Sequence, residues 1–91
     1  MISIALKITF RIFDTESLKD KRNVVKSMIN RAKKKYNISI AEIEDNDIIN
    51  QGVIGIGIVG NNRSLCRQIL EQVIADIEEQ YQVEIYDIEE I

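Results

Sequence analysis

The chain contains no histidine, no proline and no tryptophan, and it has a single cysteine among 91 residues. Without histidine it lacks the commonest general base at neutral pH, and with it His-based triads and His-ligated metal sites. These absences exclude most templates for catalysis. The sequence therefore predicts a protein that is not an enzyme and that holds no cofactor and no metal.

The single cysteine, Cys66, has no partner for an internal disulfide, which favours a reducing compartment. It falls near the apolar stripe of a predicted helix, where an inert buried thiol is expected rather than a nucleophile. No apolar run approaches the roughly 18 residues that a bilayer-spanning helix needs, and Met1–Phe10 lacks the pattern of a secretory signal. We therefore expect a cytoplasmic protein that does not span a membrane.

The missing proline fits a chain that is nearly all regular structure. A length of 91 residues suits one domain, residues 1–91, with a single two-layer core. A hydrophobic share of 45% and a charged share of 30% are those of an ordinary globular protein.

Alternating apolar and polar residues predict four strands, and two longer stretches have helical periodicity. The strands are expected over residues 2–12, 37–44, 52–60 and 82–91, and the helices over residues 17–36 and from Asn61 or Asn62 through Ile77. Ser17 and Asp20 have the side chains and the spacing to satisfy free amides at the first helix start. A bulge or a twist is expected near Ile40–Ala41, and the last strand changes phase after Ile85. The apolar stripe of the second helix is predicted to include Leu65.

With right-handed crossovers, the order βαββαβ places strands one and three at the centre of the sheet and strands two and four at its edges. This predicts an α/β (α+β) fold of the ferredoxin-like type: a two-layer sandwich of one four-stranded antiparallel sheet with two helices on one face. The helices are expected to cover the face that carries Ile4, Ile8 and Ile56.

The opposite sheet face carries two glycines in its third strand. Because these glycines lie inside a strand, they do not match a phosphate-binding loop, which needs glycines in a strand-to-helix turn. Glycine in a strand indicates tight packing, a kinked sheet or the close approach of a partner. The candidate partner face comprises Lys7, Thr9, Arg11, Gly55 and Gly57.

Charge is divided unevenly along the chain. Residues 1–36 have ten Lys/Arg and three Asp/Glu, a balance of +7, whereas residues 37–91 have two and twelve, a balance of −10. Lys19, Arg22, Lys26 and Lys33 are spaced by three, four and seven residues, so they form a strip along one edge of the first helix. Such a strip suits a phosphate backbone and supplies affinity without sequence readout, although it is also the pattern of a merely solvated helix face. The candidate RNA-binding residues are Lys19, Lys21, Arg22, Lys26, Arg31, Lys33 and Lys34.

The stretch from Ser17 to Arg22, S-L-K-D-K-R, followed by Val25, Lys26 and Ile29, resembles the signature S-L-K-[ED]-K-R of the bacterial DUF503, or YlxP-like, family. Residues 37–42 are similar to that family's N-V-S-V-A-E, and residues 55–62 resemble its glycine-containing third strand and asparagine-led helix start. The resemblance covers essentially the whole chain.

The resemblance implies a ferredoxin-like domain of an uncharacterised family with no established enzymatic activity. Family genes often neighbour those for transcription elongation, ribosome maturation and translation initiation factors, which implies a role near ribosomal RNA or the assembling small subunit. By this resemblance, the motif residues expected to have this role are Lys19, Lys21 and Arg22. Family members often have a histidine and an aromatic residue in the hairpin, where this chain has Asn46 and Ile49.

Two functional hypotheses are favoured over a third, a hydrolase or small-ligand regulatory domain, which the ferredoxin-like fold also hosts. The first is a non-catalytic RNA-binding accessory factor, associated with the ribosome or with translation, whose first helix lies along phosphates while the acidic second half of the chain faces away. Its partners are RNA or ribosomal particles. The second is a homodimeric or protein-interaction module that binds through the open sheet face or an edge strand, since oppositely charged halves can also attract copies head to tail.

Overall fold

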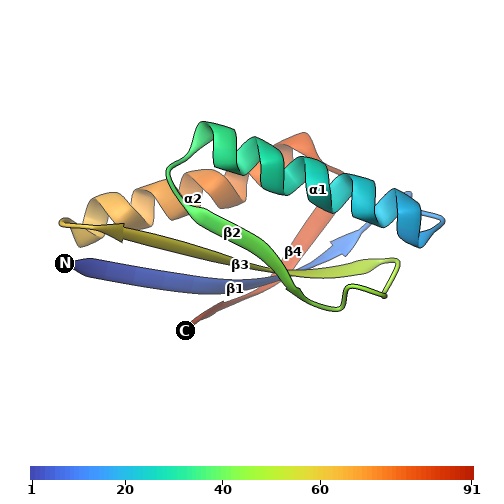
Figure 1. Ribbon diagram of the computed structural model, residues 1–91, viewed down its shortest axis with the longest axis horizontal. Helices are drawn as coiled ribbons and strands as arrows, with labels where there is room; N and C mark the ends of the chain where they lie inside the picture. The colour runs from blue at the N-terminus through green and yellow to red at the C-terminus, as the bar shows by residue number, and fades with distance from the viewer.

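Four strands and two helices form in the order that the periodicity predicts. A computed structural model describes residues 1–91 and gives the elements as β1 (Ile2–Ile12), α1 (Leu18–Lys35), β2 (Ser39–Glu44), β3 (Gln51–Gly60), α2 (Arg63–Gln80) and β4 (Val83–Glu90). Figure 1 shows one sheet with both helices on the same side of it. The predicted ferredoxin-like sandwich is therefore confirmed.

The sheet has the order β2-β3-β1-β4, and each neighbouring pair is antiparallel. The central β1–β3 ladder runs from the pair Ile2 and Gly60 to the pair Arg11 and Gln51. In contrast, β4 pairs with residues 6–12 of β1, and β2 pairs with residues 53–57 of β3. The central ladder thus extends beyond both edge strands at the end where β1 begins (Figure 1).

The core lies between the sheet and the helices. The even-numbered residues of β1 from Ile4 to Ile12 are buried, as alternation along a strand requires. From the helices, the buried apolar residues are Val25, Met28 and Ala32 of α1 and Cys66, Leu70, Val73 and Ile77 of α2. Cys66 is 3% exposed, as expected for a structural thiol. Neither helix meets the length and hydropathy that crossing a bilayer would require.

Side chains cap the first turn of each helix. The Ser17 hydroxyl accepts from the Asp20 amide at 3.1 Å, and the Asp20 carboxylate accepts from the Glu16 amide at 3.2 Å. In α2 the Asn62 side chain accepts from the Leu65 amide at 3.1 Å. Both caps satisfy amides that the helix itself leaves free, and both occur where the sequence predicts them.

The bulge of β2 lies two residues later than predicted. Ile40 is buried and stays in register opposite Ile56, so alternation continues to Glu42 and the extra residue is Ile43. The predicted position near Ile40–Ala41 is wrong because the core requires Ile40 in phase. In β4 the register shift leaves Tyr86 as the extra residue, which confirms the expected change of phase.

Leu65 was predicted to belong to the apolar stripe of α2, and this is wrong. Its side chain is 52% exposed, whereas the next residue, Cys66, is buried. The buried residues of α2 are Cys66, Leu70, Val73 and Ile77. Leu65 comes one residue before the first of them and lies outside this buried face.

Two glycines of β3 make room for the core. A methyl group at Gly52 would lie 2.5 Å from the Phe10 ring, which is completely buried, and one at Gly60 would lie 2.7 Å from the Cys66 sulfur. Because side chains of β1 and α2 occupy these spaces, a larger residue at either position would have to displace a buried side chain.

We expect Gly52→Ala to lower the free energy of unfolding by about 1–3 kcal/mol, the usual cost of overpacking a core. Urea denaturation measures this loss. In a Phe10→Leu background the same change should cost less, because the smaller side chain leaves room for the methyl group. An equal cost in both backgrounds would contradict the assigned contact.

Candidate nucleic-acid interface

The basic residues of α1 divide into a paired and an unpaired set. Lysines 19, 26, 33 and 34 are exposed and have no carboxylate oxygen within ion-pair distance. The other four cations of the helix each contact a carboxylate of a later segment: Lys21 with Glu42, Arg22 with Asp47, and Arg31 and Lys35 with Asp76. Half of the helix cations are therefore in ion pairs within the chain, with three carboxylates between them.

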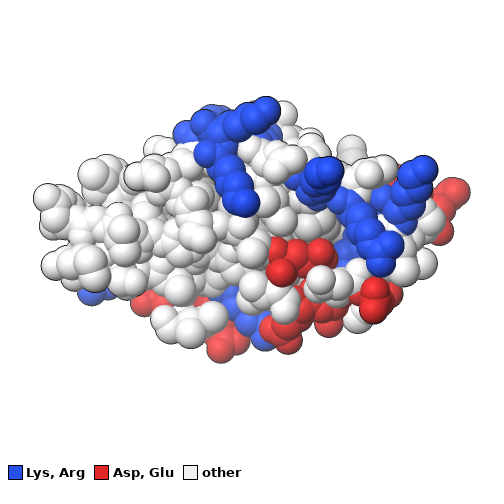
Figure 2. All heavy atoms as spheres, in the orientation of Figure 1, with Lys and Arg blue, Asp and Glu red and all other residues white.

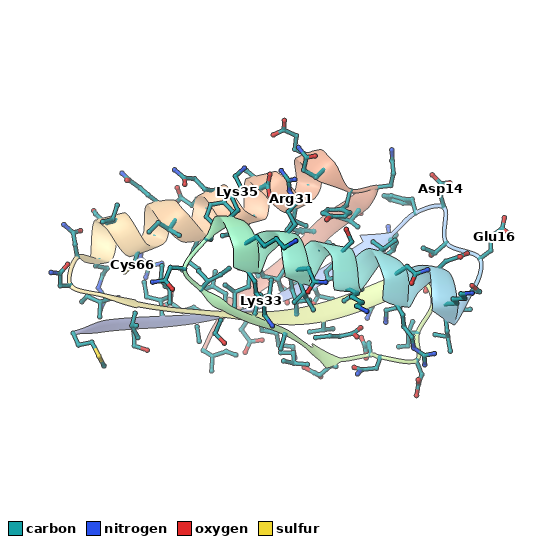
Figure 3. All side chains as sticks on the ribbon, turned by 45° about the horizontal axis from the view of Figure 1, so that its top comes forward. Asp14, Glu16, Arg31, Lys33, Lys35 and Cys66 are labelled. Atoms are coloured by element: carbon teal, nitrogen blue, oxygen red, sulfur yellow. The ribbon has the colours of Figure 1, made fainter.

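Lys19, Lys26 and Lys33 form what we call the lysine row. They follow one flank of α1, with Arg22 between the first two. At 1.5 Å per residue, Lys19 and Lys33 are about 21 Å apart along the helix axis. Figure 3 shows Lys33 on the side of α1 away from α2, and Figure 2 shows basic side chains over α1 with acidic side chains below them, over β2 and the loop that follows it.

Arg22 makes only a weak ion pair. Its guanidinium lies 3.5 Å from the carboxylate of Asp47, and the two side chains are 61% and 87% exposed. Exposed pairs of this kind contribute little to stability, because water and salt compete with them. Another anion, such as a phosphate, could replace Asp47 at little cost.

Lys21 is not part of the surface. Its side chain is 1% exposed, and its ammonium group donates to the carbonyl oxygen of Asp45 and lies 3.3 Å from the carboxylate of Glu42. The interpretation of Lys21 as an RNA-binding residue is wrong, because an ammonium enclosed by its own chain cannot reach a phosphate. The helical spacing carries a signal of this burial: Lys21 precedes Val25 by four residues and Met28 by seven, which places it on the core face.

The buried ammonium holds the β2–β3 loop against the start of α1. Asp45 begins this loop with a left-handed backbone at φ 59°, and its carboxylate accepts from the side-chain amide of Gln51 at 2.8 Å. At the far side of the loop, the Thr15 hydroxyl donates to the Ile49 carbonyl. Lys21 thereby helps to place the loop that carries Asp47 beside the lysine row.

We expect Lys21→Met to destabilise the fold by about 3 kcal/mol, because it leaves the Glu42 charge without its cation. The buried Glu42 oxygen that faces Lys21 makes no hydrogen bond, so the ammonium is its only compensation. Urea denaturation of the variant measures the loss. The double change Lys21→Met with Glu42→Gln removes both charges and should recover part of the stability; no loss in the single variant would contradict the role given to Lys21.

Arg31 joins the two helices rather than extending the lysine row. Its guanidinium donates to both carboxylate oxygens of Asp76, at 3.0 and 3.1 Å, and Lys35 donates to the same carboxylate at 3.4 Å. These donors, Arg31 first, hold the pKa of Asp76 below its ordinary value, because they stabilise the charged form. Arg31 therefore lies between α1 and α2, on the flank opposite Lys33 (Figure 3).

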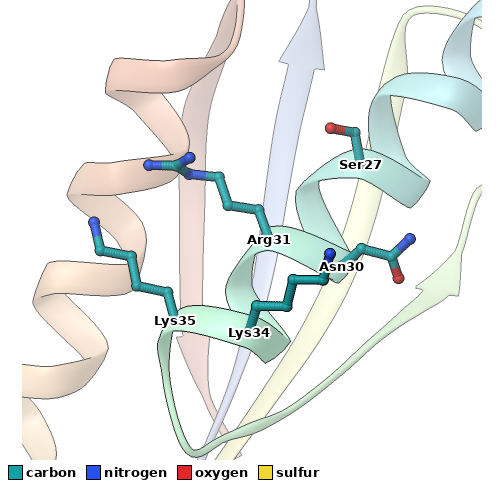
Figure 4. A pocket seen from close by; sticks show the side chains of 5 residues that line it. All are labelled: Ser27, Asn30, Arg31, Lys34 and Lys35. Carbon is teal, nitrogen blue, oxygen red and sulfur yellow. The ribbon is translucent and has the colours of Figure 1, made fainter.

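A polar hollow of about 510 Å³ lies beside Arg31, on the flank of α1 opposite Lys33. It is lined by Ser27, Asn30, Arg31, Lys34 and Lys35, with no apolar side chain. Figure 4 shows Arg31 and Lys35 directed toward α2, while Lys34 extends beside Asn30. Since Asp76 balances only one of the three cations, the hollow keeps a positive charge that suits a phosphate group.

The acidic second half of the chain does not face away from α1 as expected. Glu42 and Asp47 approach the helix from β2 and its loop, and Asp76 approaches it from α2. The expectation is wrong because these carboxylates pair with helix cations that would otherwise repel one another. Among the cations of α1, those left without an ion pair are the four lysines.

Much of the candidate partner face is filled by the chain's own side chains. Lys7 pairs with Glu44 at 2.6 Å, and Arg11 pairs with Glu84 at 3.3 Å. Ile43 covers Gly55, since a methyl group at Gly55 would lie 3.2 Å from it.

Tyr86 also covers part of this face, near Arg11 and Gln51. Its hydroxyl donates to the Gln51 side chain at 2.6 Å, and the Arg11 guanidinium lies 5.6 Å from its ring centre. Thr9, opposite Asp87 and Val53 in register, is half-buried there. Of the two glycines proposed for this face, Gly57 alone has open space above it.

Comparisons with known proteins agree with this architecture. The model of the family described as "Protein of unknown function (DUF503)" matches residues 4–90. The "Uncharacterized protein YlxP" of Bacillus subtilis (strain 168) is 37% identical over 67 residues, which cover 74% of this chain and 73% of that protein. A solved structure titled "Structural Genomics, protein YJCS" covers 99% of this chain and 97% of its own, with a TM-score of 0.57 and 10% identity, which supports the fold alone.

Proposed function

The chain belongs to the DUF503 family, whose description assigns no activity, and from its surface we propose that it is a non-catalytic RNA-binding accessory factor of the cytoplasm, associated with ribosome assembly or translation. One observation carries the proposal: the lysine row on α1 is exposed and is neutralised by no carboxylate of the chain. In the proposed complex, α1 lies along an RNA backbone, with its lysines at phosphates.

The unpaired state of the row supports an anionic partner. The chain has 15 acidic residues and a net charge of −3, so carboxylates are plentiful. Three of them nevertheless pair with other cations of the same helix and leave the row free. Like charges close together on one helix flank repel one another and destabilise the fold. Contact with phosphates would offset this repulsion. The acidic remainder opposes indiscriminate adhesion to nucleic acid, so binding depends on the orientation of α1.

The surface around the row favours the RNA backbone over the bases. Reading single-stranded bases requires aromatic side chains on which they stack, and the row contains none. The exposed aromatic residues lie elsewhere, with Phe13 in the loop after β1 and Tyr86 on the open sheet face. The polar hollow near Lys34 adds a second place for a phosphate. We therefore propose a helical segment of RNA as the partner, with ribosomal RNA favoured by the family's gene neighbourhoods.

We expect the triple change of Lys19, Lys26 and Lys33 to Gln to weaken binding to ribosomal RNA, because three phosphate contacts are lost. The slope of log K against log salt concentration should fall by about 2–3, close to one per contact. Fluorescence anisotropy over a salt series measures both quantities.

A matched control removes the same charge elsewhere. Lys7, Arg11 and Arg67 each pair with a carboxylate away from α1, so changing all three to Gln alters the net charge equally. This control should keep the slope of the unchanged protein. Equal loss in both triple variants would mean that net charge, and not the row, drives binding. Co-sedimentation with ribosomal particles at low and high salt tests the ribosomal part separately.

Asp47 should compete with phosphate for Arg22. We expect Asp47→Asn to raise RNA affinity by several-fold, because it removes an exposed carboxylate 3.5 Å from a cation beside the row. Asp87→Asn, which makes the same charge change on β4, serves as the control and should have a smaller effect. If both changes raised affinity equally in the same titration, local competition at Arg22 would be disproved.

A further inference from the structure

Gly57 is the one glycine whose missing side chain no contact within the chain explains. A methyl group would collide with Phe10 at Gly52 and with the Cys66 sulfur at Gly60, and it would touch Ile43 at Gly55. At Gly57 the same group would meet no atom within 4 Å. The space above this residue is open.

Backbone conformation does not require glycine at this position either. No glycine of the chain has a positive φ, and Gly57 pairs in regular register with Ala5 on one side and Ser39 on the other. Inside a strand, glycine costs stability because it loses more conformational freedom on folding and packs no side chain. The remaining reason for glycine in a strand is the close approach of another molecule.

The surroundings of Gly57 form a shallow hollow on the open sheet face. It has a volume of about 460 Å³ and no charged side chain in its lining. The side chains around Gly57 are small or apolar: Ser3, Ala5, Ser39 and Val59. Val59 is 66% exposed, and Met1, which immediately precedes β1, is 99% exposed.

Two strand edges are also unpaired at this end of the molecule. β4 stops opposite Leu6, with one further hydrogen bond from the Ile91 amide to Ala5, and β2 starts opposite Gly57. The ladder between residues 2–4 and residues 58–60 therefore has no neighbour on either side. In Figure 2 this end shows almost no charged side chains on the face in view.

The charge distribution favours a second copy of the chain as the occupant of this surface. A two-fold contact places a patch against its own copy, so like charges would oppose any such contact through basic α1 or acidic β4. The hollow around Gly57 has no charge to repel its copy, and it offers RNA no cation. We propose that this end of the open sheet face, centred on Gly57, packs against the same surface of a second copy of the chain about a two-fold axis.

This dimer does not rest on the proposed RNA binding. The helices cover the other face of the sheet, so both lysine rows would remain accessible in the dimer. Loss of one property would leave the other measurable.

The test is the molar mass of the protein by sedimentation equilibrium, from micromolar to millimolar concentration. We expect the mass to rise to twice the monomer value of 10.5 kDa. Gly57→Glu should keep the protein monomeric, because it places like charges on both sides of the contact while the fold has room for the side chain. Gly57→Val tests bulk without charge and should weaken the dimer as well.

Gln72→Glu is the matched control, because it adds the same charge to the exposed surface of α2. It should dimerise like the unchanged chain, and circular dichroism should show that all variants are folded. The dimer should persist in molar salt, since the contact is uncharged, whereas head-to-tail attraction between the basic and acidic halves would be lost. A protein that stays monomeric, a dimer that salt dissolves, or a Gly57→Glu variant that still dimerises would overturn the proposal.

Discussion

The enclosed ammonium of Lys21 fixes the relation between α1 and the rest of the surface. It bonds to the Asp45 carbonyl and balances Glu42, so it ties the first turns of the helix to the end of β2 and the start of the loop. A buried cation leaves its partners uncompensated when it is removed, which makes the tie costly to break. Because the loop carries Asp47, this single contact also sets where an acidic side chain stands beside the lysine row.

The surface charge of α1 depends on which of its cations form ion pairs and which do not. Three carboxylates, from β2, its loop and α2, pair with four helix cations and so attach the helix to its neighbours, while four lysines remain free. The same helix thus uses four of its cations to contact neighbouring elements and presents the other four to solvent. A count of basic residues overestimates the exposed field, because ion pairing and burial decide which residues contribute to it.

The local pattern of the sequence determined most of the fold. Alternation along β1 and β3 and the caps at Ser17 and Asn62 are properties of neighbouring residues, and these predictions are confirmed. The bulge of β2 was misplaced because its position depends on the register with β3. Register is a long-range property that residues 37–44 alone do not contain.

The candidate site was less predictable because its pairs join distant segments. Arg31 and Asp76 are 45 positions apart, and Lys21 and Glu42 are 21 apart, so spacing rules within one helix could not reveal either pair. The burial of Lys21 could have been inferred from its helical phase, but its charge favoured a surface position. The emptiness above Gly57, in contrast with the other three glycines, follows only from atomic packing.

The topology also sets the order in which the chain can fold during synthesis. β1 is a central strand, yet its partners are residues 51–60 and 83–90, so the first strand to leave the ribosome pairs among the last. α1 is made entirely from local contacts and can form before either partner exists. For that interval the nascent helix carries all eight of its cations without Glu42, Asp47 or Asp76, and the emerging protein is at its most basic beside the ribosome that makes it.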